Sequence, residues 1–241
     1  MSTDRWCASA ARAFYDENLE LARATGVPKT IGDAIYNASF PLLVGRLNID
    51  QARVLLEEAM AIFRGLGDRA ALGRCLWALG NSNWFLQRLE TAAGELDEAI
   101  QLSREVGDRF SYAWALHTRA LVAIDMHQAE VAKPLVDEAM RLFADVGDVS
   151  GIILVLTDFA DLALLEGDRE RAARLAGAAL AHEKKAGAGL GSLVSDLEGR
   201  GVSSLTTKAD LAAKAEGQAF TLDQAVAYAL DRTDAPAATG A

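Results

Sequence analysis

Residues 67–108 read GDRAALGRCLWALGNSNWFLQRLETAAGELDEAIQLSREVGD, and this stretch is one period of a pattern that recurs along the chain. Gly-Asp stands at 67–68, 107–108 and 147–148, and a lone glycine, Gly187, follows at the same step of 40 residues. Two alanine columns keep this step: Ala52, Ala92, Ala132 and Ala172, and Ala59, Ala99, Ala139 and Ala179. A period of this length is typical of stacked supersecondary units, so the sequence predicts a solenoid.

Each period predicts a pair of helices. Glycine tolerates the left-handed conformation that ends one helix, and aspartate accepts hydrogen bonds from the free amides that open the next. In the first pair, a cap at Asn48 or Asp50 precedes apolar residues at helical spacing from Ala52 to Phe63. The other predicted helices cover 4–25, 30–47, 68–85, 90–106, 108–126, 129–146, 148–165 and 168–186. Pro134 falls within a first turn if its helix starts at Val131, and marks a kink otherwise.

The predicted fold is all-α, a right-handed α-α superhelix of about four 40-residue helix pairs with terminal capping helices. A single domain is expected over 1–232, with repeats at 26–66, 67–106, 107–146 and 147–186. Residues 1–25 form an N-terminal helix, interpreted as the second helix of a repeat whose first helix is absent. Residues 187–232 form a C-terminal cap, in which Thr221 and Gln224 make a capping box. The tail, 233–241, is small, polar and expected to be disordered.

Composition narrows the class of partner. The net charge is −10 and the pI is about 4.8, which disfavours general attraction to nucleic acid or anionic lipid. Cys7 and Cys75 have no metal-binding spacing, so both are expected to be buried thiols. Since the first residues lack an apolar signal core and no apolar run is long enough to span a membrane, a soluble, cytoplasmic protein is predicted.

The spacing of small residues resembles the tetratricopeptide repeat. A small residue late in the first helix is followed by alanines twelve and nineteen positions on, as in Gly80, Ala92 and Ala99, with Leu96 at a large position between them. The next two units repeat this with Ala120, Ala132, Val136 and Ala139, and with Ala160, Ala172, Ala176 and Ala179. The step exceeds the usual one of about 34 residues, which implies longer helices.

This longer form resembles the C-terminal helical arm of bacterial LuxR-type and cyclase-linked signal-transducing ATPase regulators. Residues 170–179, ERAARLAGAA, are similar to their last repeat, and residues 215–230, AEGQAFTLDQAVAYAL, are similar to their closing motif. The chain has no phosphate-binding Gly-x-x-x-x-Gly-Lys-Ser/Thr loop, so ATP hydrolysis is not implied. The resemblance therefore implies the scaffold and a sensing or docking role.

Few residues suggest chemistry. Asp158 and Asp161 lie three apart in an apolar setting, where burial could raise a carboxyl pKa for acid–base work. The alternative is that they are two hydrogen-bonded or solvated acids. No cysteine has a histidine partner for nucleophilic work, and no metal site or cofactor is predicted. The chain is accordingly predicted not to be an enzyme.

The inner face of the predicted helical array is a better candidate for a functional site than these acidic residues. Tetratricopeptide arrays line their concave groove with positions two, five, nine and twelve of each first helix. These positions hold Asn37, Arg74, Trp77, Asn81, Trp84, Trp114, His117, Leu121, Thr157 and Asp161. Tryptophan beside Arg, Asn and His is typical of a recognition surface, although each tryptophan could equally pack between helices.

Three functions follow from these patterns. The leading hypothesis is a non-catalytic interaction module of a bacterial signalling or transcription-regulatory system, docking a peptide or partner helix in its groove. The second is a small-molecule sensor that uses the same groove, and the third is a helical enzyme that uses Asp158, Asp161 and His117. The opening half-repeat also leaves open a homodimer through an exposed apolar end.

Overall fold

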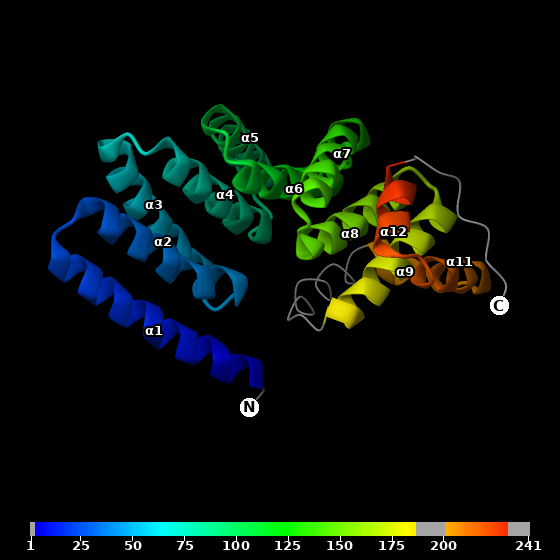
Figure 1. Cartoon of the computed structure of the whole chain (residues 1–241), viewed down its shortest axis with the longest axis horizontal. Helices are drawn as coiled ribbons and strands as arrows, with labels where there is room; N and C mark the ends of the chain where they lie inside the picture. Colours follow the sequence, from blue (N-terminus) through cyan, green and yellow to red (C-terminus); the bar gives the residue numbers. More distant parts are fainter. Residues whose placement is uncertain (1–2, 187–200, 231–241) are drawn as a thin grey trace. The chain divides into compact units, whose positions relative to one another are not determined.

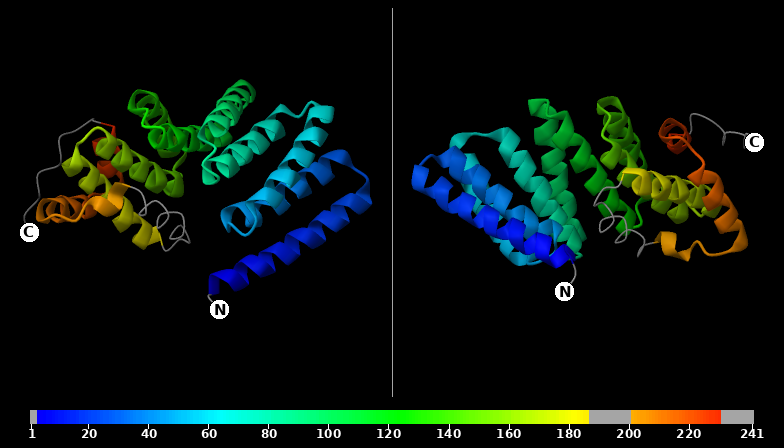
Figure 2. Two further views of the ribbon diagram at one scale, coloured as in Figure 1. Left: turned by 180° about the vertical axis from the view of Figure 1, so that it is seen from behind. Right: turned by 60° about the horizontal axis from the view of Figure 1, so that its bottom comes forward.

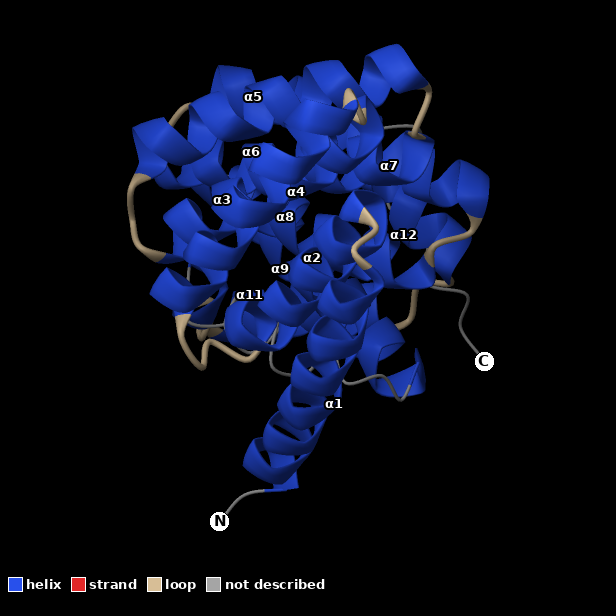
Figure 3. Ribbon diagram, turned by 90° about the vertical axis from the view of Figure 1, so that its left-hand side faces the viewer, coloured by secondary structure: helices blue, strands red, loops and turns tan. Residues whose placement is uncertain are grey.

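A computed structural model of the chain describes residues 3–186 and 201–230, and every regular element in these ranges is helical (Figures 1 and 3). The first nine elements are α1 Thr3–Thr25, α2 Pro28–Val44, α3 Ile49–Leu66, α4 Arg69–Phe85, α5 Leu89–Val106, α6 Arg109–Asp125, α7 Ala129–Val146, α8 Val149–Leu165 and α9 Arg169–Ala186. The short 3-10 helix η1 Gly201–Ser204 follows, then α11 Lys208–Gln218 and α12 Leu222–Ala229. Each predicted helix is present to within about two residues of its expected ends, except that the second helix ends at Val44 rather than at 47.

The chain divides into two compact units, Met1–Thr118 and Arg119–Ala241, and the division falls within α6. In the first unit α1 packs on α2, α2 on α3, α3 on α4 and α4 on α5. In the second unit α7 packs on α8, α8 on α9 and α9 on α11. Within each unit, these helices that are neighbours in sequence are therefore neighbours in space, and they run antiparallel (Figures 1 and 2). The all-α array of sequential antiparallel helix pairs is confirmed.

The Gly-Asp signals act as predicted. Gly67, Gly107 and Gly147 adopt left-handed φ values of 68°, 73° and 70°. The aspartate that follows each one accepts a hydrogen bond of 3.0 Å from the backbone amide three residues later, at Ala71, Ser111 and Gly151. Each dipeptide thus closes one helix and opens the next with backbone and side-chain chemistry that is local in sequence.

The turn inside each helix pair also recurs. Arg46, Gln87, His127 and Gly167 hold positive φ values of 48°, 56°, 58° and 86° at nearly the same step. Three of these residues carry a Cβ, which in the left-handed region costs on the order of 1–2 kcal/mol. In the first pair, Asn48 rather than Asp50 is the cap, because its side chain accepts from the amide of Gln51 at 3.0 Å.

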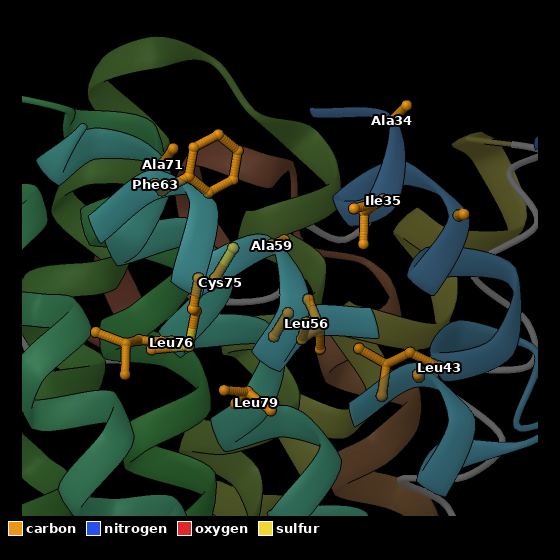
Figure 4. Packing of buried hydrophobic residues seen from close by; sticks show 14 of the residues in the cluster. Ala34, Ile35, Leu43, Leu56, Ala59, Phe63, Ala71, Cys75, Leu76 and Leu79 are labelled. Atoms are coloured by element: carbon orange, nitrogen blue, oxygen red, sulfur yellow. The ribbon is translucent and has the colours of Figure 1, made fainter. Parts of the chain in front are cut away.

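The alanine columns lie in the core. All eight alanines are at most 1% exposed, and Leu56, Leu96 and Val136 between them are fully buried. In the first unit, Ala52, Leu56, Ala59 and Ala99 join a cluster with Ile35 and Leu79 (Figure 4). A Cβ at Gly80 would lie 2.5 Å from Cγ of Leu96, so α4 and α5 approach too closely for any larger residue there. Small residues in the two alanine columns allow the helices to pack closely.

The C-terminal part contains a helix that the sequence analysis does not place. Helix α11 begins at a capping box of Thr207 and Asp210, and α12 begins at the predicted box of Thr221 and Gln224. Ala212 and Ala219 follow Ala172 and Ala179 at the 40-residue step, but both are exposed, whereas Ala213 and Gly217 of α11 are buried. The predicted tail 233–241 and much of the segment before Gly201 lie outside the described residues.

Two further observations concern single helices. Because α7 begins at Ala129, Pro134 lies inside the helix, beyond its first turn. None of the helices in the described part of the chain is long and apolar enough to cross a membrane.

Candidate functional site

A row of aromatic side chains crosses the first helices of the repeats in the first unit. Tyr36 and Phe40 of α2 have ring centroids 5.2 Å apart, and Phe40 lies 6.2 Å from Trp77 of α4. Trp77 lies 6.2 Å from Trp114 at the start of α6, with the rings in an edge arrangement. We call Tyr36, Phe40, Trp77 and Trp114 the aromatic row. All four are half-buried, so each presents part of its ring to solvent.

Hydrogen bonds hold the middle of the row in place. The indole Nε1 of Trp77 donates to Oγ1 of Thr118 at 3.0 Å, and the hydroxyl of Thr118 donates to the carbonyl of Trp114 at 3.1 Å. Nδ2 of Asn81 donates to the carbonyl of Trp77 at 3.0 Å and lies 3.4 Å from the same hydroxyl. Since Thr118 is only 1% exposed, this network is shielded from water, and it ties the indole of Trp77 to the backbone of α6.

Arg74 supplies the charge beside the row. Its guanidinium lies 5.8 Å from the ring centroid of Tyr36, and one nitrogen lies 3.7 Å from Oδ1 of Asp33. The Arg74 and Asp33 side chains are 34% and 41% exposed, so water weakens their attraction and both can contact another molecule. Burial raises the pKa of Tyr36, which keeps its hydroxyl neutral.

The residues predicted to line the groove in the first unit differ in where they lie. Arg74, Trp77, Asn81 and Trp114 come together in or beside the aromatic row. His117 touches this group from the buried side, with its ring 5.8 Å from Trp114 and only 6% of the residue exposed. Asn37 is exposed on α2, whereas the Trp84 ring packs on Phe85, with the ring centroids 5.0 Å apart.

The predicted residues of the second unit are buried. Leu121, Thr157 and Asp161 are 3%, 6% and 5% exposed, and the Thr157 hydroxyl donates to the carbonyl of Leu154 at 2.6 Å. Asp158 is fully buried one turn before Asp161. Burial, and then the neighbouring Asp158, raise the pKa of Asp161 to about 7. Asp161 is therefore expected to change its protonation near neutral pH.

Chemical groups suited to catalysis are few among the described residues. No group of three or more His, Cys, Asp or Glu side chains that could hold a metal ion occurs in residues 3–186 and 201–230. Burial raises the pKa of the Cys75 thiol to about 12, so it is a poor nucleophile at neutral pH. The side chain of Cys7 lies outside the described part of the chain.

Several members of the site are missed by sequence reasoning. Tyr36 and Phe40 flank the predicted Asn37 but do not occupy the four expected positions, and Thr118 follows His117. Phe110, 61% exposed and 6.2 Å from Trp114, extends the aromatic surface. The available signal for Tyr36 and Phe40 was their spacing of four residues, which places both aromatic rings on one face of the predicted helix.

The chain matches no protein-family model and no curated protein.

Proposed function

We propose that the chain is a non-catalytic interaction module that binds a peptide or partner helix along the aromatic row. The finer form of the proposal is a tetratricopeptide-like superhelix serving a bacterial signalling or transcription-regulatory system. The observation that carries it is the row itself: four half-buried rings from three successive first helices, with the central Trp77 indole held by a hydrogen bond to the buried Thr118 hydroxyl.

The chemistry of the row suits a peptide. Partly exposed aromatic rings provide apolar contact area at small entropic cost, because each has only two side-chain torsions. Arg74 and Asp33 can each exchange their weak mutual pairing for a charge on the bound segment. Asn37, exposed on α2 beside Tyr36, can bond to a peptide backbone.

The test is photo-crosslinking from defined positions in the full chain within its host. A photoreactive residue at Asn37, beside the row, is compared with one at Glu98, exposed on the second helix α5. We expect one polypeptide to crosslink from position 37 and not from 98. Combining Trp77→Ala with Arg74→Ala should abolish that product while far-ultraviolet circular dichroism remains unchanged.

The other outcomes separate the rival functions. A polypeptide that crosslinks equally from both positions would contradict the assignment of the row. Survival of the product in the folded double variant would do the same. Saturable quenching of tryptophan fluorescence by a metabolite, with ligand-dependent thermal stabilisation and no polypeptide product, would favour the small-molecule sensor instead.

A further inference from the structure

Three turns of the first unit connect α1 to α2, α3 to α4 and α5 to α6. Ion pairs join these turns to one another. Nζ of Lys29 in the first turn lies 2.9 Å from Oδ2 of Asp68 in the second. Nη2 of Arg69 in the second turn pairs with Oε2 of Glu105 in the third. The three turns therefore lie side by side and form one edge of the first unit.

Positive charge gathers at this edge, although the chain as a whole has a net charge of −10. Residues 23–29 contain two cations and no acid, residues 64–70 two cations and one acid, and residues 104–110 two cations and two acids. The equivalent turn of the second unit, residues 144–150, contains two acids and no cation. The cations are therefore not required by the repeat itself.

The acids of this edge already have partners within the chain. Asp68 and Asp108 cap the helices that follow them by accepting backbone amides at 3.0 Å, and the third acid, Glu105, makes the ion pair between turns. Arg64 and Arg104 are exposed, and neither forms an ion pair with another residue in the described part of the chain. Their charges are therefore available to another molecule.

Each turn also exposes one aliphatic side chain close to an arginine. Val27, Leu66 and Val106 are 49%, 46% and 40% exposed. An arginine stands two residues before the leucine and before the second valine, and four residues before the first valine. We call this set the cationic edge: Arg23, Val27, Arg64, Leu66, Arg104 and Val106. Alternating cations and aliphatic groups on adjacent turns can recognise both charge and apolar area.

We infer that the cationic edge is a docking site for an acidic amphipathic segment of another protein, whose carboxylates pair with the arginines while its aliphatic side chains cover the valines and the leucine. Arg23 can take part, because its 3.2 Å contact with Glu58 joins side chains that are 53% and 45% exposed and is readily exchanged. A narrow segment meets only this edge, whereas a flat anionic membrane would also meet the acidic remainder of the chain. The edge is separate from the aromatic row and does not rest on the function proposed for it.

The test uses two synthetic peptides with the same leucines, one with glutamates between them and the other with lysines. Fluorescence anisotropy measures their binding to the full chain. The glutamate peptide should bind saturably despite the negative net charge of the protein. Arg64→Glu and Leu66→Ser should each weaken that binding by at least about fivefold. Arg64→Glu should not weaken any binding of the lysine peptide.

Matched controls separate this site from a general effect of charge or apolar area. Arg88→Glu makes the same charge change in the turn between α4 and α5, and Val54→Ser removes an apolar residue that is 63% exposed elsewhere on α3. Both should alter the dissociation constant by less than about twofold. Equal weakening by Arg64→Glu and Arg88→Glu, unchanged binding in Leu66→Ser, or no saturable binding of the glutamate peptide would overturn the proposal.

Two further measurements distinguish other occupants and other sites. Vesicles of anionic lipid that sediment the unmodified chain but not Arg64→Glu would assign the edge to a membrane and overturn the protein segment. Loss of glutamate-peptide binding on combining Trp77→Ala with Arg74→Ala would place the peptide on the aromatic row and overturn the edge. Unchanged peptide binding in that double variant, without vesicle binding, supports the cationic edge.

Discussion

At the scale of single residues, two glycines set the distance between α9 and α11. A Cβ at Gly217 would lie 1.9 Å from the carbonyl oxygen of Arg174, and one at Gly177 would lie 2.1 Å from that of Lys214. Both obstacles are backbone atoms, which cannot move aside as a flexible side chain can. The two glycines therefore allow the two helix backbones to touch.

We expect Gly217→Ala to lower the free energy of unfolding by about 1–3 kcal/mol, because the added methyl forces α11 away from α9. Gly94→Ala is the matched control, since Gly94 lies inside α5 with no atom within 4 Å of an added Cβ. That change should stabilise the chain by about 0.5–1 kcal/mol. Urea denaturation followed by circular dichroism measures both, and an unchanged midpoint for Gly217→Ala would contradict the close contact.

Asp161 makes stability depend on pH. Burial and Asp158 raise its pKa from 3.8 to about 7, so between these values the folded chain binds a proton that the unfolded chain releases. Stability from this group is therefore fully present below about pH 4 and is lost as the pH rises to 7.

Asp161→Asn should remove this loss, because asparagine stays neutral throughout. Between pH 5 and 7.5, the fall in unfolding free energy should be smaller in the variant by about 2–3 kcal/mol. Urea midpoints at the two pH values provide the measurement. An identical pH dependence in both proteins would show that Asp161 titrates normally in the folded state.

At the scale of the helix pair, α4 and α5 contain a polar pair where the other repeats are apolar. Nδ2 of Asn83 donates to Oε2 of Glu95 at 2.7 Å, and Asn83 is fully buried with no donor to its Oδ1 among the described residues. At the same step the other repeats hold Leu43, Ala123 and Ala163, and Leu55, Leu135 and Leu175. Burial raises the pKa of Glu95, against the effect of the Asn83 amide.

Replacing Asn83 and Glu95 by the apolar residues of the other repeats measures how strongly this polar pair is coupled. Glu95→Leu alone leaves the Asn83 amide buried without its acceptor and should cost about 1–3 kcal/mol. Adding Asn83→Ala should recover that loss or exceed it. A double-mutant cycle by urea denaturation measures the coupling, and additive effects would contradict a shared interaction.

Helix boundaries could be predicted wherever their chemistry is local. Gly67 with Asp68 and Thr221 with Gln224 identify helix ends because each signal acts within about four residues. The box of Thr207 and Asp210 is an equally local signal that the sequence analysis did not use, so the start of α11 was missed. The aromatic row was only partly predictable: Trp77 and Trp114 occupy expected positions, whereas the contact of Phe40 with Trp77 depends on how α2 lies against α4.

At the scale of the whole molecule, the 40-residue step organises the chain beyond the four expected repeats. It extends to α1, where residues 14–26 match residues 55–67 of α3 at a step of 41. In α11 the same step reaches Ala212 and Ala219, which are exposed, so the buried alanine columns end at α9. The division into two compact units inside α6 could not be predicted, because the repeat pattern continues through Thr118 and Arg119 unchanged.

The pairing of each helix with its neighbour in sequence has a consequence for synthesis. In either unit, most helices that pack together are next to each other along the chain or are separated by one other element. Low separation between contacting residues favours rapid folding, and a growing chain leaves the ribosome at about 5–20 residues per second. Each helix pair can therefore close within seconds of its emergence, before the next pair has been translated.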